Sequence, residues 1–83
     1  MKSITGYPEG MIILLYAFRY ALGRRTYSSM IMSEKLIAEW DNIEPGFQKQ
    51  ICDDIRHAIK HGIAGDQFDI REWEKVLRHA EGD

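Results

Sequence analysis

Hydrophobic positions recur with helical spacing along the chain and divide it into four segments. The first, residues 11–22, is unlike the others because eleven of its twelve residues are apolar or aromatic and only Arg19 is charged. At about 100° per residue, these side chains point in every direction around a helix axis. A helix that is apolar on all sides has to be covered on all sides, so we expect it at the centre of the fold. Pro8 and Gly23 suit its two ends, and a short strand at residues 12–13 is the alternative.

The second and third segments are amphipathic. Ser and Thr side chains within residues 26–29 are candidate N-caps, and apolar positions then recur with helical spacing to about Trp40. Pro45 suits the first turn of the third helix. The apolar arc of that helix runs from Phe47 to Ile63, and charged residues occupy the opposite side. Each of these helices therefore has one face to bury.

The last segment has the clearest start signal. Asp69 and Glu72 stand three residues apart, as the N-cap and N3 residues of a capping box do. An irregular arm at residues 1–7 and a frayed tail at residues 81–83 flank the helical region. The sequence therefore predicts one all-α domain over residues 1–83, a compact four-helix domain in which three amphipathic helices surround the apolar first helix.

Composition narrows the class of protein. The chain has 83 residues, of which 45% are hydrophobic and 29% charged, as in an ordinary folded domain. The apolar run is shorter than the roughly 20 residues of a membrane-spanning helix, so we expect no membrane association. It also lacks a convincing signal-peptide cleavage site and is followed by Arg24. A single cysteine, Cys52, excludes an internal disulfide, and we therefore expect a cytoplasmic protein.

One set of residues on the third helix is a weak candidate for a metal site. Asp53, His57 and His61 are spaced four residues apart and share a helix face. Two histidines one turn apart can hold a metal ion, with a carboxylate as a further ligand. The same face carries Lys49 and Lys60, which is typical of a solvated surface, and we prefer that interpretation and predict no metal.

No other constellation indicates catalysis. Asp53 and Asp54 follow Cys52 directly, and two carboxylates disfavour the thiolate that a nucleophilic cysteine needs. The chain has no glycine-rich phosphate loop and no arrangement of Ser, His and Asp typical of a hydrolase. We therefore expect neither an enzyme nor a bound cofactor.

A basic and aromatic cluster follows the first helix. Tyr20, Arg24, Arg25 and Tyr27 interleave guanidinium groups with rings that can contact phosphates and stack on bases. The structural interpretation is a set of cations at a helix C-terminus beside core tyrosines. Arg19 lies inside the apolar run, so we expect it to extend to solvent or to pair with a carboxylate of Asp41, Asp69 or Glu72.

Three segments carry a resemblance to a known group of proteins. Residues 20–27 (YALGRRTY), 40–43 (WDNI) and 69–77 (DIREWEKVL) resemble small, uncharacterised phage and prophage accessory proteins, over roughly residues 15–78. That group supplies no catalytic residues to transfer. The resemblance implies a role in phage–host conflict, in which such proteins bind a host enzyme or defence complex stoichiometrically, as anti-CRISPR proteins do.

Three hypotheses follow. The first is a non-enzymatic protein in the host cytosol that binds and inhibits a host protein, such as a CRISPR or other nuclease defence component. The second is a small nucleic-acid-binding or regulatory protein that uses Arg24 and Arg25. The third is a homodimer whose interface completes the covering of the first helix.

The second hypothesis predicts a salt-dependent gel shift with DNA or RNA, because phosphate contacts release counterions. The shift should disappear in the Arg24→Ala/Arg25→Ala variant. Absence of any shift by the parent protein at low salt would rule this hypothesis out.

Overall fold

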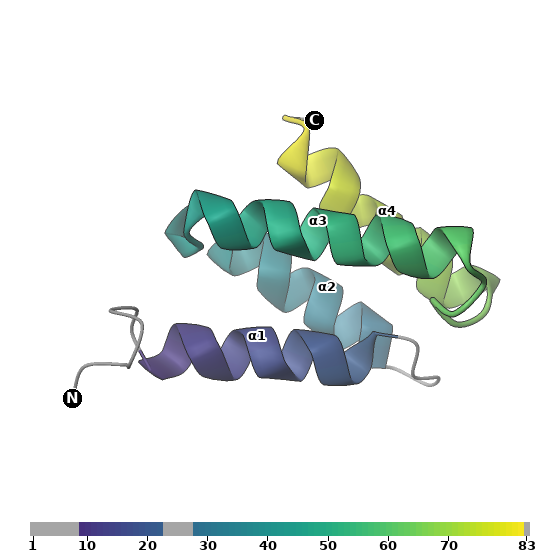
Figure 1. The fold of residues 1–83 in the computed structure, drawn as a ribbon, viewed down its shortest axis with the longest axis horizontal. Helices are drawn as coiled ribbons and strands as arrows, with labels where there is room; N and C mark the ends of the chain where they lie inside the picture. Colours follow the sequence, from purple (N-terminus) through teal and green to yellow (C-terminus); the bar gives the residue numbers. More distant parts are fainter. Residues whose placement is uncertain (1–8, 23–27, 83) are drawn as a thin grey trace.

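Successive helices run in alternating directions, so that α1 and α3 point one way and α2 and α4 the other (Figure 1). The structure is a computed structural model, and it describes the backbone of residues 9–22 and 28–82 and the side chains of residues 13–22 and 28–82. Its helices are α1 (Glu9–Ala21), α2 (Ser28–Glu39), α3 (Pro45–Lys60) and α4 (Gln67–Ala80), with a 3₁₀ turn at Trp40–Asn42. The predicted all-α four-helix domain is confirmed. None of the helices within the described ranges has the length and apolar character needed to cross a membrane.

The helices α2 and α4 form the most extensive helix–helix contact of the domain. Their buried positions follow helical spacing and are Ser29, Met32, Ser33 and Leu36 on α2, and Asp69, Glu72, Trp73 and Val76 on α4. Half of these residues are polar, which is unusual for the centre of so small a protein.

Each of the two carboxylates buried on α4 meets a serine of α2. The Ser29 hydroxyl donates to Asp69 Oδ1 at 2.5 Å, and Ser33 Oγ lies 3.2 Å from Glu72 Oε1. Lys75 Nζ approaches the second oxygen of Glu72 at 2.8 Å. A buried carboxylate without such partners would cost several kcal/mol, so these contacts determine how α2 aligns on α4.

The start of α4 differs from the expectation. The N-cap is Asp66, three residues before the predicted Asp69, and Asp69 takes the N3 position of the capping box. Asp66 N donates to Asp69 Oδ2 at 3.0 Å, and Asp69 N donates to Asp66 Oδ1 at 3.1 Å. The prediction was wrong because either aspartate satisfies the sequence pattern. Only packing against Ser29 decides which one is buried.

The expectation that the first helix is central and fully covered is also wrong. Only one side of α1 is buried, through Leu14, Phe18 and Ala21. Phe18 packs edge-on against Trp73, with the ring centroids 5.6 Å apart and the planes at 83°. Figure 1 shows α1 along one border of the domain rather than in its middle. The physical reason is that α2 and α4 bury their faces against each other and leave α1 a single contact surface.

The ends of the other elements follow the sequence closely. Pro45 occupies the first turn of α3, as predicted, and Glu44 is the N-cap of that helix. Within the predicted frayed tail, residues 81 and 82 hydrogen-bond to the last turn of α4. Glu81 N donates to Leu77 O and Gly82 N donates to His79 O, each at 3.1 Å. The predicted irregular arm at residues 1–7 lies outside the described residues.

A prediction for Gly65 follows from the capping box. Gly65 has φ +103°, and a Cβ added there would lie 2.8 Å from the Cβ of Asp69. Gly65→Ala should therefore combine the roughly 1–2 kcal/mol of a left-handed alanine with disruption of a cap, worth about 1–2 kcal/mol more. Urea unfolding measures the change. Gly82→Ala is the matched control, because Gly82 has φ +94° and open space around it. If Gly65→Ala and Gly82→Ala lowered the unfolding free energy equally, the predicted clash between the Cβ added at position 65 and Asp69 would be contradicted.

Candidate binding surface

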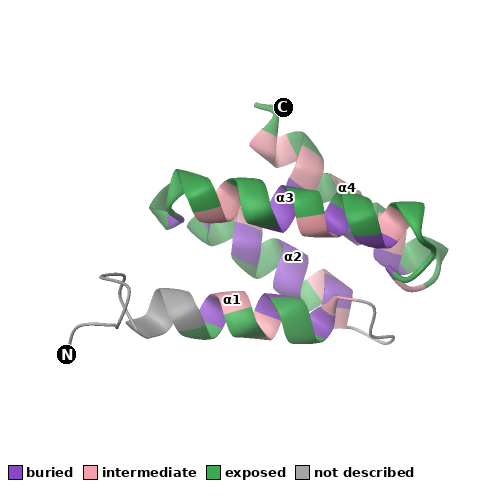
Figure 2. Ribbon diagram, viewed as in Figure 1, coloured by how far each residue is buried: buried purple, intermediate pink, exposed green. Residues whose placement is uncertain are grey.

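The exposed side of α1 carries three large apolar or aromatic side chains. Ile13, Tyr16 and Tyr20 are 62%, 72% and 68% exposed, and their i, i+3, i+7 spacing places them on one face of the helix. Figure 2 shows buried and exposed positions alternating along α1. We call these three residues the α1 stripe. A small folded protein normally places such a face in its core, so an exposed one marks a candidate interaction surface.

Beside the α1 stripe, a half-open groove of about 240 Å³ runs between α1 and α3. Its apolar walls are Leu15 and Phe18 from α1 and Phe47 and Ile51 from α3, and its polar side chains are Tyr16, Arg19, Gln50 and Asp54. Tyr16 belongs to both the α1 stripe and the groove. The two features therefore form one continuous surface.

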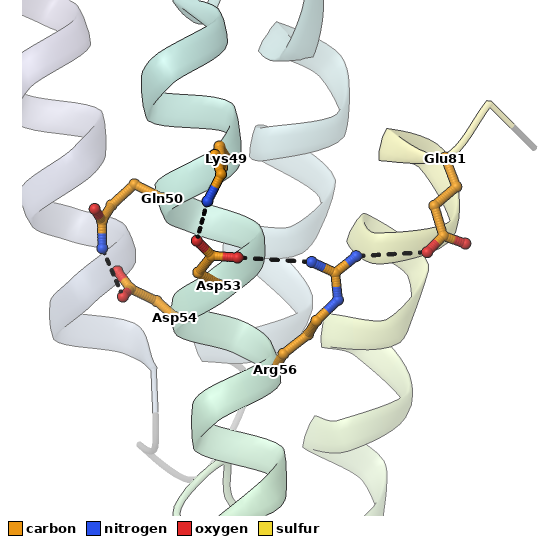
Figure 3. Close-up of polar contacts among 6 residues, drawn as sticks. All are labelled: Lys49, Gln50, Asp53, Asp54, Arg56 and Glu81. Carbon is orange, nitrogen blue, oxygen red and sulfur yellow. Dashed lines mark hydrogen bonds and ion pairs between the residues drawn. The ribbon is translucent and has the colours of Figure 1, made fainter.

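The polar side of the groove is organised around Asp54. Gln50 Nε2 donates to Asp54 Oδ1 at 2.9 Å, one helical turn apart on α3 (Figure 3). Arg19 Nε lies 3.7 Å from Asp54 Oδ2, which is an ion pair longer than a hydrogen bond. The side chain of Arg19 is 61% exposed, whereas that of Asp54 is 27% exposed. Arg19 thus lines the groove with most of its side chain exposed to solvent.

Arg19 pairs with a carboxylate of another helix, as expected, but the partner is Asp54 and not Asp41, Asp69 or Glu72. Asp69 and Glu72 face α2 and are held by its serines. Arg19 points instead towards α3, where Asp54 is the nearest carboxylate. The charged residue of the apolar helix therefore belongs to the surface groove, not to the core.

Of the four predicted partner-binding residues, the structure describes one. Tyr20 lies on the exposed face of α1, as part of the α1 stripe. Arg24, Arg25 and Tyr27 fall outside the described residues.

The candidate metal set does not form a site. The rings of His57 and His61 lie close together, with centroids 4.2 Å apart. Asp53, however, is held by Lys49 Nζ at 2.9 Å and by Arg56 Nη1 at 3.8 Å (Figure 3). No group of three His, Cys, Asp or Glu side chains in the described part of the chain is arranged to hold a metal ion. In this structure the Asp53 carboxylate contacts these two cations.

The thiol of Cys52 is buried within the core of the domain. Burial raises its pKa above the ordinary value of 9.0, Arg56 opposes this shift, and Asp53 and Glu81 reinforce it. A thiol that stays protonated is a poor nucleophile, so the structure agrees with a packing role for this side chain.

Sequence reasoning missed most of the groove. Ile13 and Tyr16 were assigned to a covered helix, and Phe47, which is partly buried, to the core. Ile51 is buried in the core as predicted and also lines the groove. The one available signal was Arg19, a charge inside an apolar run, together with Gln50 and Asp54 at i, i+4 beside the apolar arc of α3. That α1 and α3 lie next to each other depends on tertiary packing.

Comparison of the chain with protein-family models, with curated proteins and with solved structures finds no match. A function has to be argued from the residues of this surface.

The raised pKa of Cys52 predicts a pH-dependent contribution to stability. Above about pH 8.5, the unfolded chain gains stability by forming the thiolate, which the folded protein disfavours. The contribution of the protonated Cys52 thiol to the unfolding free energy is thus complete at lower pH and is lost as pH rises towards the pKa of Cys52 in the folded protein. We expect the difference in unfolding free energy between the parent protein and Cys52→Ala to shrink above pH 9. Urea titrations at pH 7 and pH 10 measure it, and an unchanged difference would contradict this prediction.

Proposed function

We propose that this chain is a non-enzymatic binding protein that docks on a partner protein through the α1 stripe. The observation that carries the proposal is the exposure of Ile13, Tyr16 and Tyr20, each above 60%, on a helix whose opposite side is buried. Aromatic residues, tyrosine among them, are enriched where protein interfaces bind most strongly, because a rigid ring buries much area at little entropic cost.

The arrangement of the domain supports this use of α1. Leu14 and Phe18 anchor the helix to the core, and Phe18 contacts the buried Trp73. A stripe held on a packed helix is already in its binding conformation, so little ordering entropy is lost on association. The groove next to Tyr16 adds a recess for a side chain of the partner.

The class of partner is a further part of the proposal. The resemblance of residues 20–27, 40–43 and 69–77 to phage accessory proteins supports a host protein, such as a nuclease or another component of a defence complex. In this proposal the chain acts stoichiometrically by covering a surface that the host protein needs.

The experiment compares affinity capture by the parent protein and by an Ile13→Ala/Tyr16→Ala variant from lysate of the cell in which the protein acts. Both side chains are largely solvent-exposed, so the unfolding free energy should change by less than about 1 kcal/mol. Binding of the captured partner should weaken at least about tenfold, as for residues at the centre of an interface.

Phe68→Ala is the matched control, because Phe68 is an exposed aromatic residue on α4, away from the α1 stripe. Its partner affinity should equal that of the parent protein. Identical capture by the parent protein and the stripe variant would refute the proposal.

A further inference from the structure

The groove between α1 and α3 also indicates what kind of partner segment it accepts. We infer that it takes one large apolar side chain, aromatic or leucine, from a partner helix that carries a carboxylate one turn away for Arg19. This inference rests on the proposed function and specifies the chemistry of the partner.

The size of the groove limits the occupant to a single side chain. Small-molecule sites usually enclose about 300–1,000 Å³, and an apolar cavity of about 150 Å³ is known to hold benzene. At about 240 Å³, the groove matches one large side chain better than a drug-sized ligand. Its lining supports the same choice, since Leu15, Phe18, Phe47 and Ile51 form an apolar floor and walls.

The charges at the mouth favour an acidic partner over a basic one. Both oxygens of Asp54 are engaged, Oδ1 by Gln50 and Oδ2 by Arg19. The ion pair joins Arg19 Nε to Asp54 Oδ2 at 3.7 Å, and Arg19 forms no other ion pair within the described ranges. The two Nη groups therefore remain as donors that fit a carboxylate in a bidentate arrangement. Asp54 is less accessible to an incoming cation than Arg19 is to an incoming anion, because its side chain is 27% exposed against 61% for Arg19.

The geometry favours a helical segment. Leu15 to Arg19 spans about 6 Å of α1 and Phe47 to Asp54 about 10 Å of α3, at 1.5 Å per residue. A recess this short holds one anchor, with Arg19 at its edge. Helical side chains three or four positions apart lie about 5–6 Å from each other, so one helix can place an apolar anchor in the recess and a carboxylate on Arg19. Further turns would lie along Tyr16 and the rest of the α1 stripe.

Defined peptides test the inference without knowledge of the natural partner. Two helical probes of about 15 residues, built on alanine and glutamine, each carry one tryptophan and differ only at the position four residues later, glutamate in one and lysine in the other. They are titrated into the ¹⁵N-labelled full chain. We expect the glutamate probe to shift the amides of residues 15–19 and 50–54, and to bind about three- to tenfold more tightly than the lysine probe.

Two variants of the chain separate the charge from the apolar recess. Arg19→Gln should reduce the preference for glutamate to near unity, and Arg71→Gln, an exposed arginine of α4, should leave it unchanged. Gln50→Glu places a second carboxylate at the mouth and should reverse the preference. Gln50 is exposed, so the Gln50→Glu variant should keep the fold. It therefore tests the inference even if the Arg19→Gln variant fails to fold.

Three results would overturn the inference. The first is that the lysine probe binds as tightly as the glutamate probe or more tightly. The second is that the amide shifts are centred away from the groove. The third is that the same amides shift with protein concentration in the absence of a peptide, because this would identify a second copy of the chain as the occupant. If the inference fails while the Ile13→Ala/Tyr16→Ala variant still loses its captured partner, the proposed function stands. If capture is unaffected by that variant, the proposed function fails whatever the peptides do.

Discussion

Two carboxylates buried between α2 and α4 are the constraint on which the rest of the structure depends. Burial of Asp69 and Glu72 requires hydrogen-bond donors. Ser29 donates to Asp69, whereas Glu72 accepts from Lys75 and from Ser33, whose hydroxyl is shared with a backbone carbonyl of α2. A shift of α2 along α4 by one residue would leave both charges without these serines. The polar contacts therefore define the alignment, and the apolar side chains around them supply the bulk of the hydrophobic stabilisation.

The position of α1 follows from the packing of α2 against α4. Because α2 and α4 bury their faces against each other, α1 docks from one side only, through Phe18 on Trp73. A helix that is apolar all round then keeps an uncovered face, and the α1 stripe is the result. Burying these side chains would be favourable at about 25 cal/mol per Å² of apolar area, and the proposed partner binding would draw on this free energy. The same physics that folds the domain thus leaves a surface suited to binding.

The sequence predicted the elements better than their arrangement. The first turn at Pro45 and most of the apolar arc of α3 depend on nearby residues alone, and both appear in the structure. The predicted end of the arc was wrong, because Ile63 lies beyond the last residue of α3 and is 58% exposed. The start of α4 was misplaced by three residues, because Asp66 and Asp69 are both acceptable caps by local chemistry. For the candidate surface, local patterns identified Tyr20 and the oddity of Arg19. They did not identify the groove, whose walls come from helices distant in the sequence.

Helical periodicity, the first turn at Pro45 and the apolar content of residues 11–22 were determined by the sequence itself, since they arise from interactions within a few turns. Tertiary structure alone decided which side of α1 stays uncovered, which carboxylate meets Arg19, and that α1 and α3 enclose a groove. The physical reason is that a helix has many faces of similar hydrophobicity when it is apolar all round. Its own sequence then gives no preference among them, and the preference comes from the shape and charge of the helices it meets.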